Sequence, residues 1–261
     1  AGSDPSGGAG IQADLKTFSA LRVYGAAVIT ALTAQNTRTV RAIHDPPVDF
    51  VAAQLDTVLS DLSVDAVKIG MLSRPEAIAT VAARLRARPN LPVVLDPVMI
   101  AKSGAALLRP EAAAALRREL LPLCRVVTPN LPEASVLLGE RQEHVLAQRE
   151  EACRRILALG ARAVVLKGGH APGPECEDLL MGEGVDGIVR LSAPRIATKN
   201  THGTGCTFAA AITAGLARGM SLPDALAAAK RYITGAIAAA DQLAVGEGHG
   251  PVHHFYEWWS A

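Results

Sequence analysis

The stretch Thr201-His202-Gly203-Thr204-Gly205-Cys206, followed by an alanine-rich run to Gly219, carries the strongest signal in this chain. A glycine-rich turn that opens a helix directs unpaired backbone N–H groups at one point, and the helix dipole adds positive potential there. Gly203 and Gly205 would let a phosphate approach the backbone closely. The helix end is also expected to lower the pKa of the Cys206 thiol. The stretch therefore predicts chemistry on a phosphate, with Cys206 at the reacting centre.

This turn differs from a Walker A loop, because no lysine follows its last glycine. A single Gly-Thr-Gly is also typical of an ordinary glycine turn. The interpretation therefore depends on what surrounds the turn.

Short apolar runs alternate with helical patterns through the rest of the chain. The runs are rich in β-branched residues and suit parallel strands that are buried on both faces. They cover residues 28–32, 66–69, 93–95, 126–127 and 164–166. Amphipathic helices are predicted at 51–62 and at 222–237, the second after a Ser221–Asp224 capping pair and a helix stop at Gly219.

The alternation of strands and helices predicts an α/β fold with a doubly wound sheet and helices on both faces. No composition break divides the chain, so a single domain over residues 1–261 is expected. Segment 171–191, rich in glycine and acidic residues, is predicted to form a hairpin or flap at the sheet edge. Ala1-Gly2-Ser3-Asp4 looks like the loop after a strand, which predicts a short apolar strand before it.

Composition argues against several classes of function. The net charge of +1 gives no reason to expect a nucleic-acid partner. No apolar run is long enough for a membrane helix, and no signal peptide is visible. The four cysteines fit neither a zinc spacing nor a disulfide framework. A cytoplasmic protein with reduced thiols, no membrane and no nucleic-acid partner is therefore predicted.

Polar residues and glycines follow the predicted strands where each strand ends. These are Gly70-Met71, Asp96-Pro97, the run Thr-Pro-Asn-Leu-Pro-Glu at 128–133, and Lys167-Gly168-Gly169. Ligands of open α/β sheets bind outside the carboxyl ends of the strands. The site is therefore predicted at this edge of the sheet.

Two motifs near the start of the chain have a functional and a structural interpretation. Four glycines between Gly2 and Gly10 precede a helix that includes Asp14, which favours a backbone wall against a substrate over a surface turn. Gln35 follows the 28–32 run, and its amide could both donate to and accept from a heterocycle. Taken alone, Gln35 fits better as a cap at the end of a strand.

Asn130 and Glu133 lie three residues apart where a strand leads into a helix. Their oxygens suit Mg²⁺ that carries nucleotide phosphates, although this motif alone favours a helix cap with an acidic first turn. Lys102 and Lys167 could pair with phosphates, but a lone lysine is usually solvated. The histidines have no metal spacing, and the aromatic tail at 253–259 is predicted to be docked structure.

Together these motifs resemble the hydroxymethylpyrimidine/phosphomethylpyrimidine kinases of thiamine biosynthesis, within the ribokinase-like superfamily. The resemblance covers nearly the whole chain. It rests on AGSDPSGGAGIQADLKTFSAL (1–21), VITALTAQNT (28–37), KIGMLS (68–73), VVLDPVM (93–99) with AKSG (101–104), TPNLPEA (128–134), KGGH (167–170), TKNTHGTGCTFAAAI (198–212) and GPVHHFYEWW (250–259).

The resemblance implies a ribokinase-like three-layer α/β/α fold with a mostly parallel doubly wound sheet and an edge flap. It implies a homodimer that uses ATP and Mg²⁺. The first of two phosphoryl transfers goes to the hydroxymethyl oxygen of 4-amino-5-hydroxymethyl-2-methylpyrimidine, and the second converts the monophosphate into the diphosphate.

The resemblance also implies a role for individual residues. Gln35 would hold the pyrimidine, surrounded by Gly2, Asp14, Thr33 and Met71. The phosphate-binding residues would be Asn130, Glu133, Lys167 and Lys102, with Glu133 acting on Mg²⁺ directly or through water. The anion hole and catalytic group would be Gly203, Thr204, Gly205 and Cys206.

The chain departs from the superfamily pattern at one of these positions. Many sugar and nucleoside kinases carry an aspartate as base where this chain has Cys206. Two alternatives stay open on the sequence: a kinase acting on pyridoxal or pyridoxine, and a non-catalytic module that binds a pyrimidine or a nucleotide. The intact phosphate motifs argue against the second, because a binding module needs no anion hole.

Overall fold

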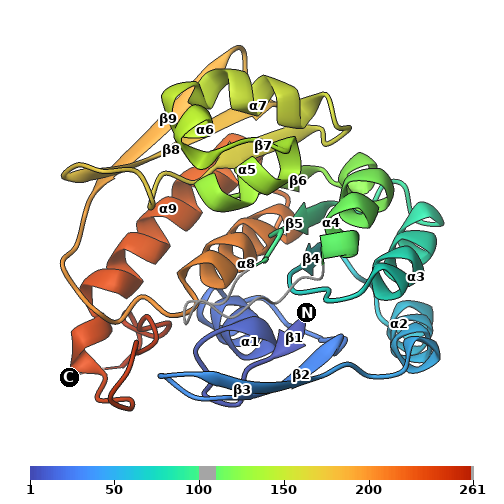
Figure 1. Cartoon of the computed structure of the whole chain (residues 1–261). Coiled ribbons are helices and arrows are strands. Elements are labelled where there is room, and N and C mark those ends of the chain that lie inside the picture. The colour runs from blue at the N-terminus through green and yellow to red at the C-terminus, as the bar shows by residue number, and fades with distance from the viewer. Residues whose placement is uncertain (100–109, 260–261) are drawn as a thin grey trace.

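The computed structural model describes residues 1–99 and 110–259 (Figure 1), so Lys102 lies outside the described residues. Within those ranges the strands form one six-stranded sheet and one three-stranded sheet. The strands are β1 Gly2–Ser3, β2 Ala31–Gln35, β3 Val40–His44, β4 Val67–Ile69, β5 Val93–Leu95, β6 Val126–Val127, β7 Ala163–Leu166, β8 Glu175–Gly182 and β9 Ile188–Pro194. The α-helices are α1 Gly10–Ala20, α2 Val48–Asp61, α3 Pro75–Arg86, α4 Pro110–Ala115, α5 Leu131–Leu138, α6 Gln142–Ala147, α7 Arg149–Leu157, α8 Thr204–Ala217 and α9 Leu222–Ala238.

The six-stranded sheet has the strand order β4-β5-β6-β7-β8-β9. Strands β4 to β7 pair in parallel, whereas β8 and β9 pair antiparallel and extend the β7 edge. The predicted hairpin in 171–191 is confirmed, although its second strand continues to Pro194. The mostly parallel sheet and the α/β class are as expected from the sequence.

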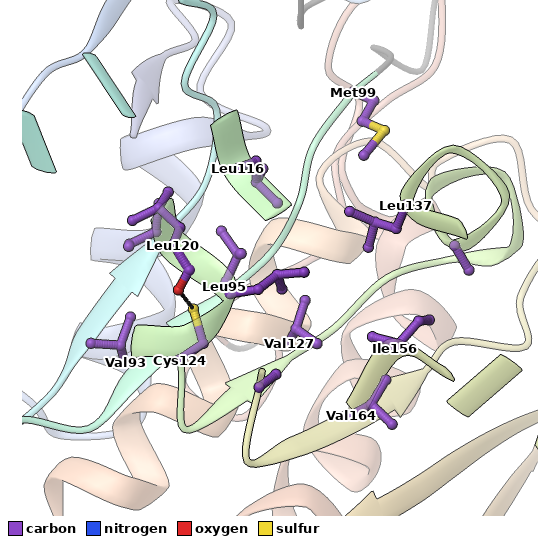
Figure 2. Packing of buried hydrophobic residues seen from close by; sticks show 14 of the residues in the cluster. Val93, Leu95, Met99, Leu116, Leu120, Cys124, Val127, Leu137, Ile156 and Val164 are labelled. Atoms are coloured by element: carbon purple, nitrogen blue, oxygen red, sulfur yellow. Dashed lines mark hydrogen bonds between the residues drawn. The ribbon is translucent and has the colours of Figure 1, made fainter. Parts of the chain in front are cut away.

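Alternating strand residues supply two hydrophobic cores, one on each face of the sheet. Val93, Leu95 and Val127 pack with residues of α3, α5 and α7 on one face. Figure 2 shows this cluster, in which the Cys124 thiol also donates to the carbonyl oxygen of Leu120 at 3.1 Å. Val94 points to the opposite core, which is built from α8 and α9. Because strand side chains alternate with a period of two, this pattern produces three layers.

Helix α8 is the most deeply placed helix of the second core, because every residue from 207 to 216 is buried. Its alanines and glycines allow a close approach to α9: a Cβ on Gly215 would lie 2.7 Å from the Cβ of Ala225. Gly219 follows the helix with φ 78°, and the Ser221 side chain caps α9 by accepting from the Asp224 N–H. The helix stop and the start of the next helix were both predicted correctly.

The start of the chain differs from the prediction. The strand expected at 28–32 is β2 at Ala31–Gln35, and it lies in the three-stranded sheet rather than in the main sheet. Gly2–Ser3, expected to be loop, forms β1 parallel to β2, and β3 completes the sheet antiparallel to β2. Alternate residues of β2 are exposed, so this strand is not buried on both faces. The apolar run at 28–32 has the composition of a strand that is buried on both faces, but it does not form one.

The aromatic tail is docked, as predicted. His253 and His254 are buried, and the Trp258 indole N–H donates to the Ala20 carbonyl oxygen at 3.1 Å. Burial lowers the pKa of His254 to about 3, so this side chain is a neutral core group beside the Thr207 hydroxyl. None of the described helices combines the length and the apolar character that crossing a membrane requires.

Candidate active site

A cavity of about 1000 Å³ lies where the carboxyl ends of β4 to β7 meet the first turn of α8 and the small sheet. Most of the residues proposed from the sequence line it. They are Gly2, Thr33, Gln35, Met71, Asn130, Glu133, Lys167, Gly203, Thr204, Gly205 and Cys206. Residues from six separate stretches of sequence therefore share one cavity, at the sheet edge that the strand ends predicted.

The first turn of α8 forms one wall of this cavity. Gly203 precedes the helix with φ 78°, a left-handed conformation that favours glycine, and a Cβ there would collide with the Gly8 carbonyl oxygen. A Cβ on Gly205 would lie 3.4 Å from the Lys167 Nζ and 3.5 Å from an Asp96 carboxylate oxygen. The Thr204 N–H donates to the Thr201 carbonyl oxygen at 3.4 Å, so the N–H groups that follow it in this turn are the ones that open beside a buried ion pair, which suits an anion.

Lys167 and Asp96 form that ion pair. The Lys167 Nζ is 2.7 Å from Asp96 Oδ1 and 3.7 Å from Glu133 Oε2, and all three side chains are largely buried. Burial alone would lower the pKa of Lys167, but the two carboxylates outweigh it and raise that pKa above its ordinary value. The ammonium is therefore a permanent positive charge beside the α8 turn.

Glu133 and Asn130 form a reciprocal capping box at the start of α5. The Glu133 N–H donates to Asn130 Oδ1, and the Asn130 N–H donates to Glu133 Oε2, both at 2.8 Å. Burial, with the charge of Asp96, raises the pKa of Glu133 to about 7, while Lys167 opposes the rise. The helix-cap interpretation is therefore confirmed, and the same carboxylate also faces the cavity.

Thr33 and Gln35 of β2 both line the cavity, because alternate residues of a strand face the same side. The Gln35 Oε1 is 3.2 Å from the Thr33 hydroxyl, and the Gln35 Nε2 is 3.3 Å from the His202 Nε2. His202 Nε2 also lies 2.7 Å from Asp4 Oδ2. Hydrogen bonding to that carboxylate needs a hydrogen on Nε2, so this nitrogen has no lone pair for Gln35. The Gln35 NH₂ group is thus available to a ligand.

Gly2, Met71 and Asp14 occupy different positions relative to the cavity. A Cβ on Gly2 would lie 3.0 Å from the Met71 sulfur, so glycine lets this side chain close the floor. Asp14 is buried and is not among the described residues that line the cavity. It contacts Lys68 instead, which does line it.

The expectation that the α8 terminus lowers the pKa of Cys206 is wrong. The thiol is partly exposed to the cavity, yet desolvation raises its pKa to about 11. The positive charge of Lys68 lowers that pKa, whereas Asp14 and Asp96 raise it further. Desolvation of the thiolate and two nearby carboxylates outweigh the helix end, which the sequence alone could not show.

Several charged or titratable groups that line the cavity, Lys230 and Asp178 among them, were not predicted from the sequence. Asp4, Lys68 and His202 were given no role in ligand binding, although all three line the cavity. Lys68 had a visible signal, because a charged residue inside an otherwise apolar strand needs a buried partner. The Asp4–His202 contact spans 198 positions and left no local signal.

Residues 4–253 match the model of one protein family, phosphomethylpyrimidine kinase. A hydroxymethylpyrimidine/phosphomethylpyrimidine kinase of Rhizobium meliloti (strain 1021) is 58% identical to the chain, over 99% of the chain and 96% of that relative. A phosphomethylpyrimidine kinase structure from Clostridium difficile 630 has a TM-score of 0.78 at 43% identity, covering 90% of the chain and 96% of that structure.

A structure of pyridoxal kinase from Staphylococcus aureus, in complex with AMP-PCP and pyridoxal, has a TM-score of 0.88 at 36% identity. The match covers 98% of the chain and 92% of that structure. Fold and cavity thus define a ribokinase-like kinase. The chain belongs to the phosphomethylpyrimidine kinase family. It is therefore a phosphotransferase, which removes the alternative of a non-catalytic binding module.

Proposed function

We propose that this chain transfers the γ-phosphoryl group of ATP to the hydroxymethyl oxygen of 4-amino-5-hydroxymethyl-2-methylpyrimidine, and then to the resulting monophosphate, in thiamine biosynthesis. One observation carries the proposal beyond the family match. A single cavity is lined both by the Gln35 amide and by the α8 turn beside Lys167. The amide suits a polar heterocycle, and the turn with Lys167 suits a nucleotide phosphate.

Gln35 would bind the pyrimidine. Its NH₂ group would donate to a ring nitrogen, while Oε1 would accept from the exocyclic amine. Thr33 supports this orientation, because its hydroxyl lies 3.0 Å from the Ser3 carbonyl oxygen and 3.2 Å from the Gln35 Oε1. Met71 and Gly2 would form the floor beneath the ring.

The α8 turn and Lys167 would stabilise charge on the transferred group. The backbone N–H groups of residues 203–206 and the Lys167 ammonium are fixed before the reaction, so little reorganisation is needed as charge develops. Lys230 of α9 holds the adjacent loop: it donates to Asp178 Oδ2 at 2.7 Å, and Asp178 Oδ1 accepts from the Gly168 N–H. We expect this loop to contact the nucleotide in both transfers.

Magnesium would be held by Glu133 and Asp96 together with the nucleotide phosphates. The donor set fits, because Mg²⁺ usually takes one or two carboxylates and keeps several waters. Glu133 Oε2 accepts from the Asn130 N–H and lies 3.7 Å from the Lys167 Nζ, and the residue lines the cavity. No group of three or more His, Cys, Asp and Glu side chains in those residues is placed to bind a metal alone. When bound, Mg²⁺ would neutralise phosphate charge.

Cys206 would accept the proton of the hydroxymethyl group during the first transfer. It lines the cavity in the first turn of α8, close enough to Lys68 and Lys167 to interact with both charges. The second acceptor, a phosphate monoester with a second pKa of about 6, is already ionised near neutral pH and needs no base.

A cytoplasmic homodimer is part of the same proposal. The outer face of β2, which carries the exposed Leu32, points away from the cavity and is a surface that a second copy would cover. Sedimentation of the wild type and of Leu32→Asp tests the oligomeric state; a wild type that sediments as a monomer refutes the homodimer.

Mass-spectrometric analysis of products formed from the pyrimidine alcohol and Mg-ATP tests the proposed reaction. We expect the monophosphate first and the diphosphate later. The alternative is a pyridoxal kinase, which the fold similarity to the Staphylococcus aureus enzyme favours. Competition between the pyrimidine alcohol and pyridoxal decides: a kcat/KM that is higher for pyridoxal would overturn the assignment of the pyrimidine as main substrate.

A further inference from the structure

Lys68 is a buried cation that none of the steps above uses. It lies in β4, paired in register with Val94 of β5, and its side chain is only 3% exposed. It lines the cavity on the side of Gly2 and Met71, and a Cβ on Gly70 would lie 2.8 Å from its Nζ. The Lys68 ammonium is therefore beside Gly70, next to the floor of the cavity, whereas the Lys167 ammonium is beside Gly205.

The hydrogen-bonding capacity of Lys68 is not exhausted. An ammonium has three N–H donors. Nζ donates to Asp14 Oδ2 at 3.0 Å and lies 2.9 Å from Oδ1, and within residues 1–99 and 110–259 no other acceptor bonds to it. Buried donors are normally satisfied, so an anion in the cavity would complete this group.

Lys230 shows the usual arrangement of a buried lysine in this protein. Its Nζ donates to Asp178 Oδ2 at 2.7 Å and to the Cys176 carbonyl oxygen at 2.8 Å. Lys167 likewise lies near two carboxylates. Among these three lysines, Lys68 is the one with a single partner residue and donors to spare.

We propose that Lys68 binds the phosphate group of the monophosphate acceptor and so serves mainly the second phosphoryl transfer. The inference rests on the proposed function and assigns this residue within it. The first acceptor is a neutral alcohol, but the second carries a charge of about −1.5 to −2 at neutral pH. Two phosphate groups must then approach each other, and a desolvated cation on the acceptor side reduces their repulsion. Lys167 is already committed to Asp96 and Glu133.

The second phosphoryl transfer needs no proton acceptor, because the attacking oxygen is already ionised. An ionised oxygen of the monophosphate attacks the γ-phosphorus of ATP, the new P–O bond forms, and the bond from that phosphorus to the β–γ bridging oxygen breaks. ADP leaves with the electron pair. Lys68 would donate hydrogen bonds to the non-attacking oxygens of the acceptor, and its proton stays on Nζ, because nearby carboxylates raise its pKa against the effect of burial.

A competing explanation assigns Lys68 to Cys206. Its charge lowers the pKa of that thiol, so it would then serve the proton transfer of the first step. The two explanations predict opposite outcomes. Loss of the Cys206 counter-charge damages phosphorylation of the alcohol, whereas loss of an acceptor-phosphate ligand damages phosphorylation of the monophosphate.

The test measures kcat/KM for each acceptor separately in wild type, Lys68→Met and Lys68→Arg. We expect Lys68→Met to lower the value for the monophosphate about 10- to 100-fold more than that for the alcohol, as for loss of a charged hydrogen bond. Lys68→Arg should recover part of the difference. Lys230→Met is the matched control: it removes a buried lysine at the nucleotide loop, and should lower both values by the same factor.

Calorimetry without nucleotide provides a second readout. Lys68→Met should lose more affinity for the monophosphate than for the alcohol. If the Lys68→Met variant does not fold, the double variant Lys68→Met/Asp14→Asn takes its place in both measurements, because it also removes the charge that Asp14 would carry without its partner. Equal losses for the two acceptors, or a larger loss for the alcohol, overturn the role of Lys68. A wild type that phosphorylates neither pyrimidine overturns the proposed function first.

Discussion

Replacing Cys206 with alanine should separate the two phosphoryl transfers. The substitution removes the thiol but keeps the backbone N–H of residue 206 and the glycine turn before it, so the anion hole persists. The alcohol must lose a proton as its oxygen bonds to phosphorus, whereas the monophosphate is already ionised. We therefore expect a large loss in phosphorylation of the alcohol and a small one in phosphorylation of the monophosphate.

The size of the loss follows from the pKa of the thiol. With a pKa of about 11, roughly one Cys206 in 3,000 is a thiolate at pH 7.5. A positioned base contributes about 10²–10⁴-fold to a proton transfer, and so scarce a thiolate places Cys206 near the lower limit at this pH. The thiolate fraction rises about 100-fold between pH 7.5 and 9.5. The loss in Cys206→Ala should therefore grow with the thiolate fraction, by up to about 100-fold between pH 7.5 and pH 9.5.

The assay measures kcat/KM for each purified acceptor between pH 7 and 9.5. For the wild type acting on the alcohol, log kcat/KM should rise with a slope near one; for the monophosphate it should be flat. Cys206→Ala should remove the slope for the alcohol. An equal loss for both acceptors, or a slope that survives in the alanine variant, refutes Cys206 as the base and leaves it a positioning role.

Three further substitutions probe the other parts of the site. Gln35→Ala should cost about 1–3 kcal/mol in binding of the pyrimidine, because polar groups of the ring lose their partner. Equal changes in KM for the pyrimidine and for ATP would contradict a role of Gln35 in binding the pyrimidine. Glu133→Gln should raise the Mg²⁺ concentration needed for half-maximal turnover. In the wild type, the raised pKa of about 7 makes the free energy of unfolding fall as the pH rises from about 4.5 to 7, and Glu133→Gln should abolish this fall. An unchanged Mg²⁺ dependence leaves Glu133 as a helix cap only. Gly203→Ala should lower the free energy of unfolding by about 1–3 kcal/mol, because φ is 78° and Gly8 blocks a Cβ; a urea midpoint like that of wild type contradicts this.

Much of the site was predictable because its residues follow strands or open helices. Asp96 and Lys167 come directly after β5 and β7, Asn130 and Glu133 lie at the start of the helix that follows β6, and parallel strands bring such ends to one edge. The turn at 203–206 has its signal in its own glycines. In each case the residues that carry the chemistry also determine the local structure, so both can be predicted from the same short stretch of sequence.

The parts that could not be predicted depend on contacts between distant segments. Nothing near residue 31 shows that β2 leaves the main sheet to pair with β1 and β3, because its apolar composition equals that of a buried strand. The Lys68–Asp14 pair joins residues 54 positions apart. The pKa of Cys206 depends on three charges from α1, β4 and the end of β5. A pKa shift of this kind combines desolvation with the effects of nearby charges, and these arise only when the folded chain brings the groups together.

Two buried lysines explain how one cavity would serve two acceptors of different charge. Lys167 has Asp96 and Glu133 as counter-charges, so its position is fixed whichever acceptor is bound. Among the described residues Lys68 has one ion-pair partner, Asp14, and burial raises the pKa of that carboxyl; the charge of Asp96 acts on Lys68 without a hydrogen bond. With a neutral alcohol in the cavity, the spare N–H donors of Lys68 have no anion; with a monophosphate, they gain one. The same arrangement would therefore tolerate the first acceptor and favour the second, so we expect calorimetry to find tighter binding of the monophosphate than of the alcohol.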